Sequence, residues 1–156
     1  MKLPLLPYDP GPLPRRPAPK AGERLELAID GWPPWKDEHF SIRNVRSPQF
    51  LAFVALRQAA IQQMDRRAWY LGPVSATLVL WGPAAHPRKR IDRYAGGVMD
   101  TLDGGHGQTF TYLPIVFEDD HQIVSWDTRF RPSPTPRYRL TFEFLPYSNG
   151  AQPNLV

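Results

Sequence analysis

Alternating apolar and polar residues mark four segments of this sequence as strands. Residues 25–30 (LELAID) and 74–81 (VSATLVLW) alternate with a period of two, which is typical of half-buried strands. Residues 122–130 and 137–145 repeat the pattern nearer the C-terminal end, and residues 109–116 are also expected to be extended. A proline pair follows the first of these segments and a glycine-proline pair follows the second, so both strands are predicted to end there.

A helix is predicted from Ser47 to about Arg66. Ser47 offers a hydroxyl at the N-cap position, and Pro48 takes the first helical position, where a missing amide hydrogen costs nothing. The apolar residues that recur at helical spacing are Phe50, Leu51, Val54, Ile61 and Met64.

A second helix is predicted from about Arg93 to Leu102. Asp92 is expected to cap its first turn, and the glycine pair at 104 and 105 is expected to end it. Gly96 and Gly97 weaken this prediction, because each glycine inside a helix costs about 1 kcal/mol of stability relative to alanine. A pair of such small residues also permits close backbone packing.

The order strand, helix, strand, helix and then two or three strands predicts an α/β or α+β fold, with a small mixed sheet and two main helices. We assign residues 23–150 to this single domain and residues 151–156 to a C-terminal tail. Residues 1–22 form an arm with seven prolines, which is expected to be extended or disordered. We favour a loose terminus. The alternative is an arm that packs along a dimer partner or touches phosphates through its basic residues, Arg15, Arg16 and Lys20.

Composition narrows the function classes. The chain has 156 residues, enough for one domain with its own core, and its lack of cysteine excludes disulfides, zinc fingers and thiol catalysis. No apolar run is long enough to cross a bilayer and the first residues do not resemble a signal peptide, so we expect a cytoplasmic protein with no membrane partner. The net charge of +4 and the pI near 9.6 favour polyanionic partners. No phosphate-cradling glycine motif is present, so no nucleotide cofactor is expected.

Acidic residues stand at two predicted strand ends. Asp92 lies at a junction between strand and helix, and Glu118, Asp119 and Asp120 lie just before another strand. Side chains from distant parts of a sequence can converge at such positions, and carboxylates are the ligands that Mg²⁺ prefers. The basic residues around the first position are Arg88, Lys89, Arg90 and Arg93. Metal-binding acids beside phosphate-binding bases suit phosphodiester cleavage. The alternative is a solvated acidic turn and a simple helix cap.

Five segments together carry a resemblance to a known family. A strand runs into a Pro-Pro loop (LELAIDGWPPW), and a helix (SPQFLAFVALRQAA) and a strand (VSATLVLW) follow. The last two segments, RIDRYAGGVMDTLDG and EDDHQIV, are the most specific. In their order and spacing, between about residues 24 and 145, they resemble the RusA-type Holliday-junction resolvases, which are crossover junction endodeoxyribonucleases. The resemblance implies a homodimer that resolves four-way DNA junctions by paired phosphodiester hydrolysis, in DNA recombination and repair. It also implies Mg²⁺ as the cofactor, with Mn²⁺ as a substitute.

The resemblance also implies roles for single residues. Asp92 takes the place of the second catalytic aspartate in the family's Asp-x-Asp-Asn element, and Asp120 that of the essential aspartate in its Asp-Asp corner. Asp119 is a catalytic candidate beside Asp120, and Glu118 is a candidate metal ligand together with Asp92 and Asp120. Asp100 matches an aspartate near the end of the family's helix. It is a secondary candidate, because the helical rise places it about 12 Å from Asp92, too far to share one ion.

Three positions depart from the family pattern. Arg90 stands where the family has its first aspartate, Arg93 stands in place of its asparagine, and Gly96 in place of its helix lysine. Arginine stays protonated and cannot ligate a cation, so one ligand must come from elsewhere. The candidates are Glu118 first, then His121 and Asp103. Arg93 can supply the positive charge of the lysine. The alternative is a degenerate site, in a protein that binds branched DNA without cutting it.

Aromatic and basic residues supply further candidates for DNA binding. Besides the residues around Asp92, namely Arg88, Lys89, Arg90 and Arg93, they are Trp35, Lys36 and Arg43. Trp32 and Trp35 can stack on unpaired bases or cover the core, and we favour the core for Trp32. The four arginines nearer the C-terminal end either line a DNA channel or lie on solvated faces: Arg129, Arg131, Arg137 and Arg139. A third class of function is an interaction protein that binds through its proline arm.

Overall fold

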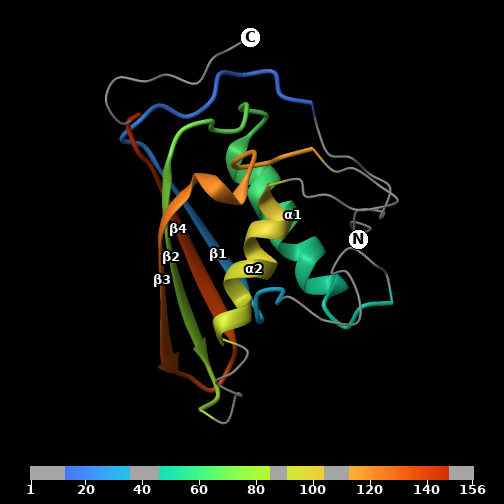
Figure 1. Cartoon of the computed structure of the whole chain (residues 1–156). Coiled ribbons are helices and arrows are strands. Elements are labelled where there is room, and N and C mark those ends of the chain that lie inside the picture. Colours follow the sequence, from blue (N-terminus) through green and yellow to red (C-terminus); the bar gives the residue numbers. More distant parts are fainter. Residues whose placement is uncertain (1–12, 36–45, 85–90, 104–112, 148–156) are drawn as a thin grey trace.

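Both helices of this protein lie on one face of a four-stranded mixed sheet (Figure 1). The computed structural model describes residues 13–35, 46–84, 91–103 and 113–147. In chain order the elements are β1 (Arg24–Asp30), α1 (Phe50–Met64), β2 (Val74–Gly82), α2 (Ile91–Leu102), the short 3-10 helix η2 (Asp120–Gln122), β3 (Ile123–Pro132) and β4 (Arg137–Phe144). The predicted α+β class, with a small mixed sheet and two main helices, is confirmed. Within the described ranges, no helix has both the length and the apolar character needed to span a membrane.

The strands are arranged in the order β1-β4-β2-β3. β4 pairs antiparallel with β1 and with β2, whereas β2 and β3 are parallel. A parallel pair needs a long crossover connection, and the chain between β2 and β3 supplies one that contains α2. Because Val74 is in register with Ile123, the acidic residues that precede β3 lie at the end of the sheet where β2 begins.

The helix-bearing face of the sheet forms the hydrophobic core. Leu27, Leu140 and Leu78 lie side by side across β1, β4 and β2, and each is at most 1 % exposed. Tyr94 and Val98 of α2 are completely buried in the same cluster. Successive side chains of a strand point to opposite faces, so a sheet covered on one side requires the alternation seen in the sequence. All four alternating segments are strands, with bounds within two residues of the prediction.

Both helices begin differently from the prediction. Ser47 is not the N-cap of α1: its Oγ accepts a hydrogen bond from the amide of Gln49 (3.1 Å), and Gln49 itself occupies the cap position. Asp92 lies inside the first turn of α2 rather than at its cap, because the helix begins at Ile91. The extended segment predicted at 109–116 is not a strand over its described part, and its first residues lie outside the described ranges.

The described part of the proline-rich arm, residues 13–22, is attached to the domain. The amide of Arg16 donates to the carbonyl of Arg66 (3.0 Å), and the amide of Ala68 donates to the carbonyl of Arg16 (2.9 Å). Arg16 also forms an ion pair with Asp65, with 2.6 Å between Nη1 and Oδ2. The expectation of a loose terminus is therefore wrong for this part, and the rest of the arm lies outside the described residues.

Candidate metal-binding turn

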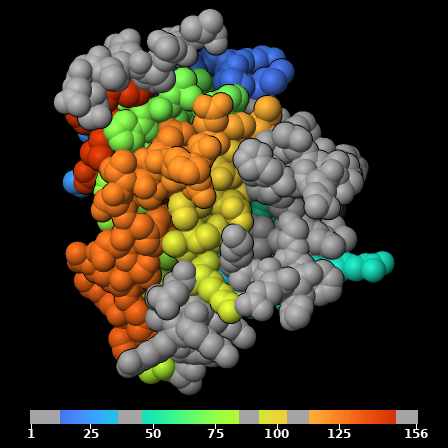
Figure 2. Space-filling view, in the orientation of Figure 1, coloured from blue at the N-terminus to red at the C-terminus, as the bar shows by residue number. Residues whose placement is uncertain are grey.

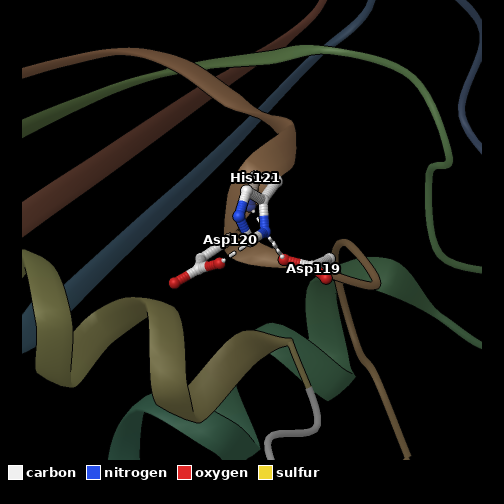
Figure 3. A group of neighbouring side chains, drawn as sticks. All are labelled: Asp119, Asp120 and His121. Carbon is white, nitrogen blue, oxygen red and sulfur yellow. Dashed lines mark hydrogen bonds and ion pairs between the residues drawn. The ribbon is translucent and has the colours of Figure 1, made fainter.

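Two carboxylates and an imidazole meet in the turn that leads into β3. Figure 3 shows these residues, Asp119, Asp120 and His121, which we call the Asp-Asp-His turn. His121 Nδ1 lies 2.7 Å from Asp119 Oδ1 and 3.3 Å from Asp120 Oδ1. One possible ligand atom of each residue lies within 4.8 Å of the others. No second group of three such residues comes this close in the part of the chain that the structure describes.

A capping box shapes this turn. Asp119 is the N-cap of η2, and its Oδ1 accepts a hydrogen bond from the amide of His121 (2.9 Å). In return, Gln122 Oε1 accepts one from the amide of Asp119 (3.0 Å). An oxygen-bearing cap followed three residues later by glutamine is the sequence pattern of this motif. Gln122 Nε2 also donates to the carbonyls of Tyr70 and Gly72, at 2.7 and 2.8 Å, which attaches the turn to the segment that enters β2.

Gln122→Ala is expected to lower the free energy of unfolding by about 1–3 kcal/mol, because it leaves backbone amides and carbonyls without their protein partners. Urea denaturation followed by circular dichroism measures the change. Gln62→Ala is the matched control, since Gln62 is exposed on α1 and its loss should change stability by less than about 0.5 kcal/mol. A cost no larger than that of the control would show that Gln122 does not hold the turn.

The two carboxylates raise the pKa of His121. The backbone amide of His121, and then its side chain, lower the pKa of Asp119 to about 2, and Asp120 contributes less. The hydrogen bond to Asp119, and then attraction to both carboxylates, raise the pKa of His121 above its ordinary 6.5. Since hydrogen bonds and opposite charges favour the charged form of a group, the metal-free turn favours imidazolium at the expense of neutral imidazole.

We therefore expect His121 of the metal-free protein to titrate above pH 6.5. Because its pKa is raised on folding, its contribution to stability is complete below pH 6.5 and is lost as the pH rises through the raised value. The contribution of Asp119 has the opposite sense, being present above pH 3.8 and lost as the pH falls toward 2.

An NMR titration of the His121 Cε1–H resonance, assigned by comparison with His121→Gln, measures this pKa. Asp119→Asn should move the midpoint down toward 6.5, because Asp119 is the largest cause of the shift. A midpoint that stays where it was in the wild type would contradict the role given to Asp119.

The structure brings together only part of the predicted acidic set. Asp119 and Asp120 lie in the turn as predicted, but Glu118 does not belong to the group with close ligand atoms. Its backbone amide donates to Gln122 Oε1 (2.7 Å). His121, a weaker candidate in the sequence, takes the place expected of Glu118. The signal for it was the spacing Asp-x-His in front of a glutamine, which becomes meaningful only as part of a capping box.

Asp92 lies at the far end of α2 from the segment that leads to the turn. The carbonyl of Leu102, the last residue of α2, accepts hydrogen bonds from the amides of Ile115 and Val116, at 3.0 and 3.3 Å. Asp92 precedes Leu102 by ten positions, about 15 Å along the helix axis. Figure 1 accordingly shows η2 beside the C-terminal half of α2. The side chain of Asp92 lies outside the described part, so its role as a metal ligand stays a prediction that the backbone does not favour.

Asp100 and Asp103 lie at the end of α2 nearer to the turn. Asp100 is half-buried and Asp103 is 9 % exposed, and both take part in interactions of their own. Neither belongs to the group with close ligand atoms. The secondary candidate Asp100 is thus nearer to the turn along the helix than Asp92 is, but it does not complete the ligand set.

Most of the predicted DNA-binding residues lie outside the described residues: Lys36, Arg43, Arg88, Lys89 and Arg90. Arg93 is exposed near the start of α2. Trp32 and Trp35 are partly buried and pack against the core, and the Trp32 ring stacks on Tyr94, with 6.3 Å between centroids. The interpretation of Trp32 as a cover for the core is confirmed. The same packing favours the core over base stacking for Trp35.

The Asp-Asp-His turn is open to solvent, and its three side chains offer ligand atoms that could hold a divalent cation. In Figure 2 the orange surface that includes η2 and β3 adjoins the yellow surface of α2. The His121 side chain is 90 % exposed, and each of the two carboxylate side chains is 52 % exposed. Two carboxylates suit Mg²⁺ and Mn²⁺, and an imidazole nitrogen suits transition metals such as iron, nickel and zinc. The hydrogen bond between Asp119 and His121 must break before both can face one ion.

A search against models of known protein families finds no match to this chain, and a search of curated proteins finds none.

Proposed function

We propose that this protein is a divalent-metal-dependent endodeoxyribonuclease that cuts branched DNA, four-way junctions above all. The observation that supports it is the exposed Asp-Asp-His turn, where three possible metal ligands lie within 4.8 Å of one another. The resemblance to RusA-type resolvases suggests the substrate, and the net charge of +4 suits a polyanion. The proposed cofactor is Mg²⁺, with Mn²⁺ as a substitute, and the proposed location is the cytoplasm.

Mg²⁺ or Mn²⁺ held at the turn would supply a nucleophilic water at neutral pH and would stabilise negative charge on the phosphate. Asp119 and Asp120 would hold the ion from adjacent positions, and His121 would join them only with its Nδ1 deprotonated. Gln122 keeps the turn in place through its bonds to the carbonyls of Tyr70 and Gly72, so binding would require only the Asp119 and His121 side chains to reorient. The exposure of all three side chains allows a DNA backbone to approach from solvent.

A homodimer is part of this proposal. The described residues of one chain contain one Asp-Asp-His turn, and resolving a junction requires nicks in two opposed strands. A dimer with two-fold symmetry presents two identical turns for this purpose. Analytical ultracentrifugation of the protein, alone and with a junction, measures whether two chains are present.

Cleavage of a labelled synthetic four-way junction in Mg²⁺ tests the proposal. Asp120→Asn is expected to reduce cleavage by about 100-fold or more, since the loss of even an outer partner of a metal ligand costs up to that much. Asp65→Asn is the matched control, because Asp65 is also exposed and its left-handed backbone (φ 48°) suits asparagine. Equal cleavage by the two variants would remove the turn from the mechanism.

Binding of Mn²⁺ gives a second readout that does not depend on cleavage. Paramagnetic Mn²⁺ is expected to broaden the His121 resonance in the wild type, and Asp120→Asn is expected to prevent this at the same concentration. Broadening that is equally strong in Asp120→Asn would mean that the ion binds elsewhere. Asp92→Asn tests the remaining predicted ligand in the same way.

A second candidate is a protein of the same fold that binds branched DNA without cutting it. Arg90, Arg93 and Gly96 favour it, since they replace an aspartate, an asparagine and a lysine of the family pattern. This candidate predicts junction binding that weakens steeply with salt, and no turnover in Mg²⁺ or Mn²⁺. Reproducible metal-dependent nicking that Asp120→Asn abolishes would exclude it.

A further inference from the structure

The sheet has a second face, which carries neither helix. On the helix-bearing side, Leu80 of β2 is in register with Phe130 of β3 and Tyr138 of β4. Since neighbouring residues of a strand point to opposite faces, the adjacent residues point away from the helices. They are in register with one another as well: Trp81, Arg131 and Arg137.

Four exposed arginines and a tryptophan lie together at one end of this open face. We call them the arginine patch: Trp81, Arg129, Arg131, Arg137 and Arg139. Trp81 lies between the two arginines of its own row, and the other two arginines lie one row nearer to the middle of the sheet. In these two rows the one acidic residue is Asp30, on the edge strand β1. The patch therefore has an excess of positive charge.

Half of these arginines have carboxylate partners. Arg129 pairs with Asp127 at 2.8 Å, and Arg139 pairs with Glu26 at 3.4 Å. The two arginines that flank Trp81 have no ion-pair partner among the described residues. Their charges are therefore available to an external anion.

Trp81 holds part of the patch in place. The Arg137 guanidinium carbon lies 4.3 Å from the centre of the Trp81 ring, and that of Arg139 lies at 5.6 Å. Stacking on an aromatic ring orients the guanidinium plane and leaves N–H groups at its edge for bidentate hydrogen bonds to phosphate. A side chain that is already oriented loses less entropy when it binds.

We propose that the arginine patch binds the phosphate backbone of a nucleic acid, on a surface separate from the Asp-Asp-His turn. Arg129 and Arg131 lie six and eight residues beyond Ile123, where β3 begins, which is about 20 to 26 Å along the strand. Four exposed guanidinium groups on one face of the sheet suit a polyanion. A second copy of this chain fits less well, because a two-fold pairing of the patch with itself would bring arginine against arginine.

Fluorescence anisotropy of a labelled DNA duplex, with the full-length chain in EDTA at several NaCl concentrations, tests the proposal. Arg131→Gln combined with Arg137→Gln is expected to weaken binding and to reduce the slope of log K against log[salt] by about two, since each phosphate contact contributes about 0.9. Arg24→Gln is the control, because Arg24 is exposed at the other end of the same face and pairs with Glu143 (2.7 Å). Its slope should equal that of the wild type.

Asp127→Asn provides a variant with the opposite effect. It removes the carboxylate partner of Arg129 and is expected to strengthen DNA binding. The test therefore remains decisive even if the double variant is unstable. An unchanged slope in the double variant, or no tightening in Asp127→Asn, overturns the proposal. A dimer that dissociates in the double variant while the salt slope stays constant also overturns it, since the face would then be an interface between two copies.

This binding does not require the proposed nuclease activity. The measurement is made in EDTA and is repeated in the Asp120→Asn background, where the metal-binding turn is impaired. A wild-type protein that shows salt-dependent binding but no cleavage in Mg²⁺ therefore counts against the proposed nuclease site alone. Cleavage without the expected slope change counts against the patch alone.

Discussion

Phe142→Ala is expected to lower the free energy of unfolding by about 3–5 kcal/mol, the usual cost of removing a fully buried phenylalanine ring. Phe142 is 0 % exposed in β4, with Leu25 of β1 and Ala76 of β2 in register on either side. Its ring contacts that of Phe117, and the two centroids are 6.1 Å apart. Phe117 directly precedes the acidic residues 118–120 in the sequence. Typical domains are stable by about 5–15 kcal/mol, so this loss is a large share of the total.

Urea denaturation followed by circular dichroism measures the effect of Phe142→Ala. Leu51→Ala is the control, because Leu51 is 73 % exposed on α1 and its truncation should cost less than about 0.5 kcal/mol. Since Phe117 leads into the Asp-Asp-His turn, the His121 resonance should also change in Phe142→Ala and not in Leu51→Ala. Equal stabilities of the two variants would contradict the placement of the core on the helix-bearing face.

Gly97→Ala is expected to destabilise the protein by about 1–3 kcal/mol, although alanine is the better helix former by about 1 kcal/mol. A Cβ atom at Gly97 would lie 2.2 Å from the carbonyl oxygen of Pro34 and 2.7 Å from the Cα atom of Trp35. These are backbone atoms of the turn after β1, and they cannot move aside as the end of a flexible side chain can. The helix α2 must shift away from that turn to make room.

Ala55→Gly measures the helix-propensity contribution by itself. Ala55 is exposed in the middle of α1, so this change should cost about 1 kcal/mol and touch nothing else. If Gly97→Ala instead stabilises the protein by a similar amount, the close approach of α2 to the Pro-Pro turn is refuted. The expected cost would give Gly97 a packing role against the Pro-Pro turn.

The elements of the fold could be predicted because their signals are local. A strand that is covered on one face must alternate, and all four alternating segments are strands. The starts of the helices were less predictable, since a cap is decided by a few backbone angles. Ser47 and Asp92 both have favourable cap chemistry, and neither takes the cap position.

The candidate site was predictable only where its residues are neighbours in the sequence. Asp119 and Asp120 are adjacent, so their proximity required no knowledge of the fold. Asp92 could meet Asp119 and Asp120 only if the turn before β3 lay beside the first turn of α2, where Asp92 is. The hydrogen bonds from Ile115 and Val116 to Leu102 place the returning chain at the opposite end.

By itself, the sequence determined the fold class, the four strands and the two helices, because hydrophobic periodicity follows directly from which side of an element is covered. It also supplied the pair of carboxylates and the basic composition. Only the tertiary structure decided that His121 joins the carboxylates, through a capping box held by Gln122. It also decided that arginines from β3 and β4 flank Trp81 of β2. Both outcomes depend on strand register and on where a turn docks, and such contacts between distant residues leave no periodic signal in the chain.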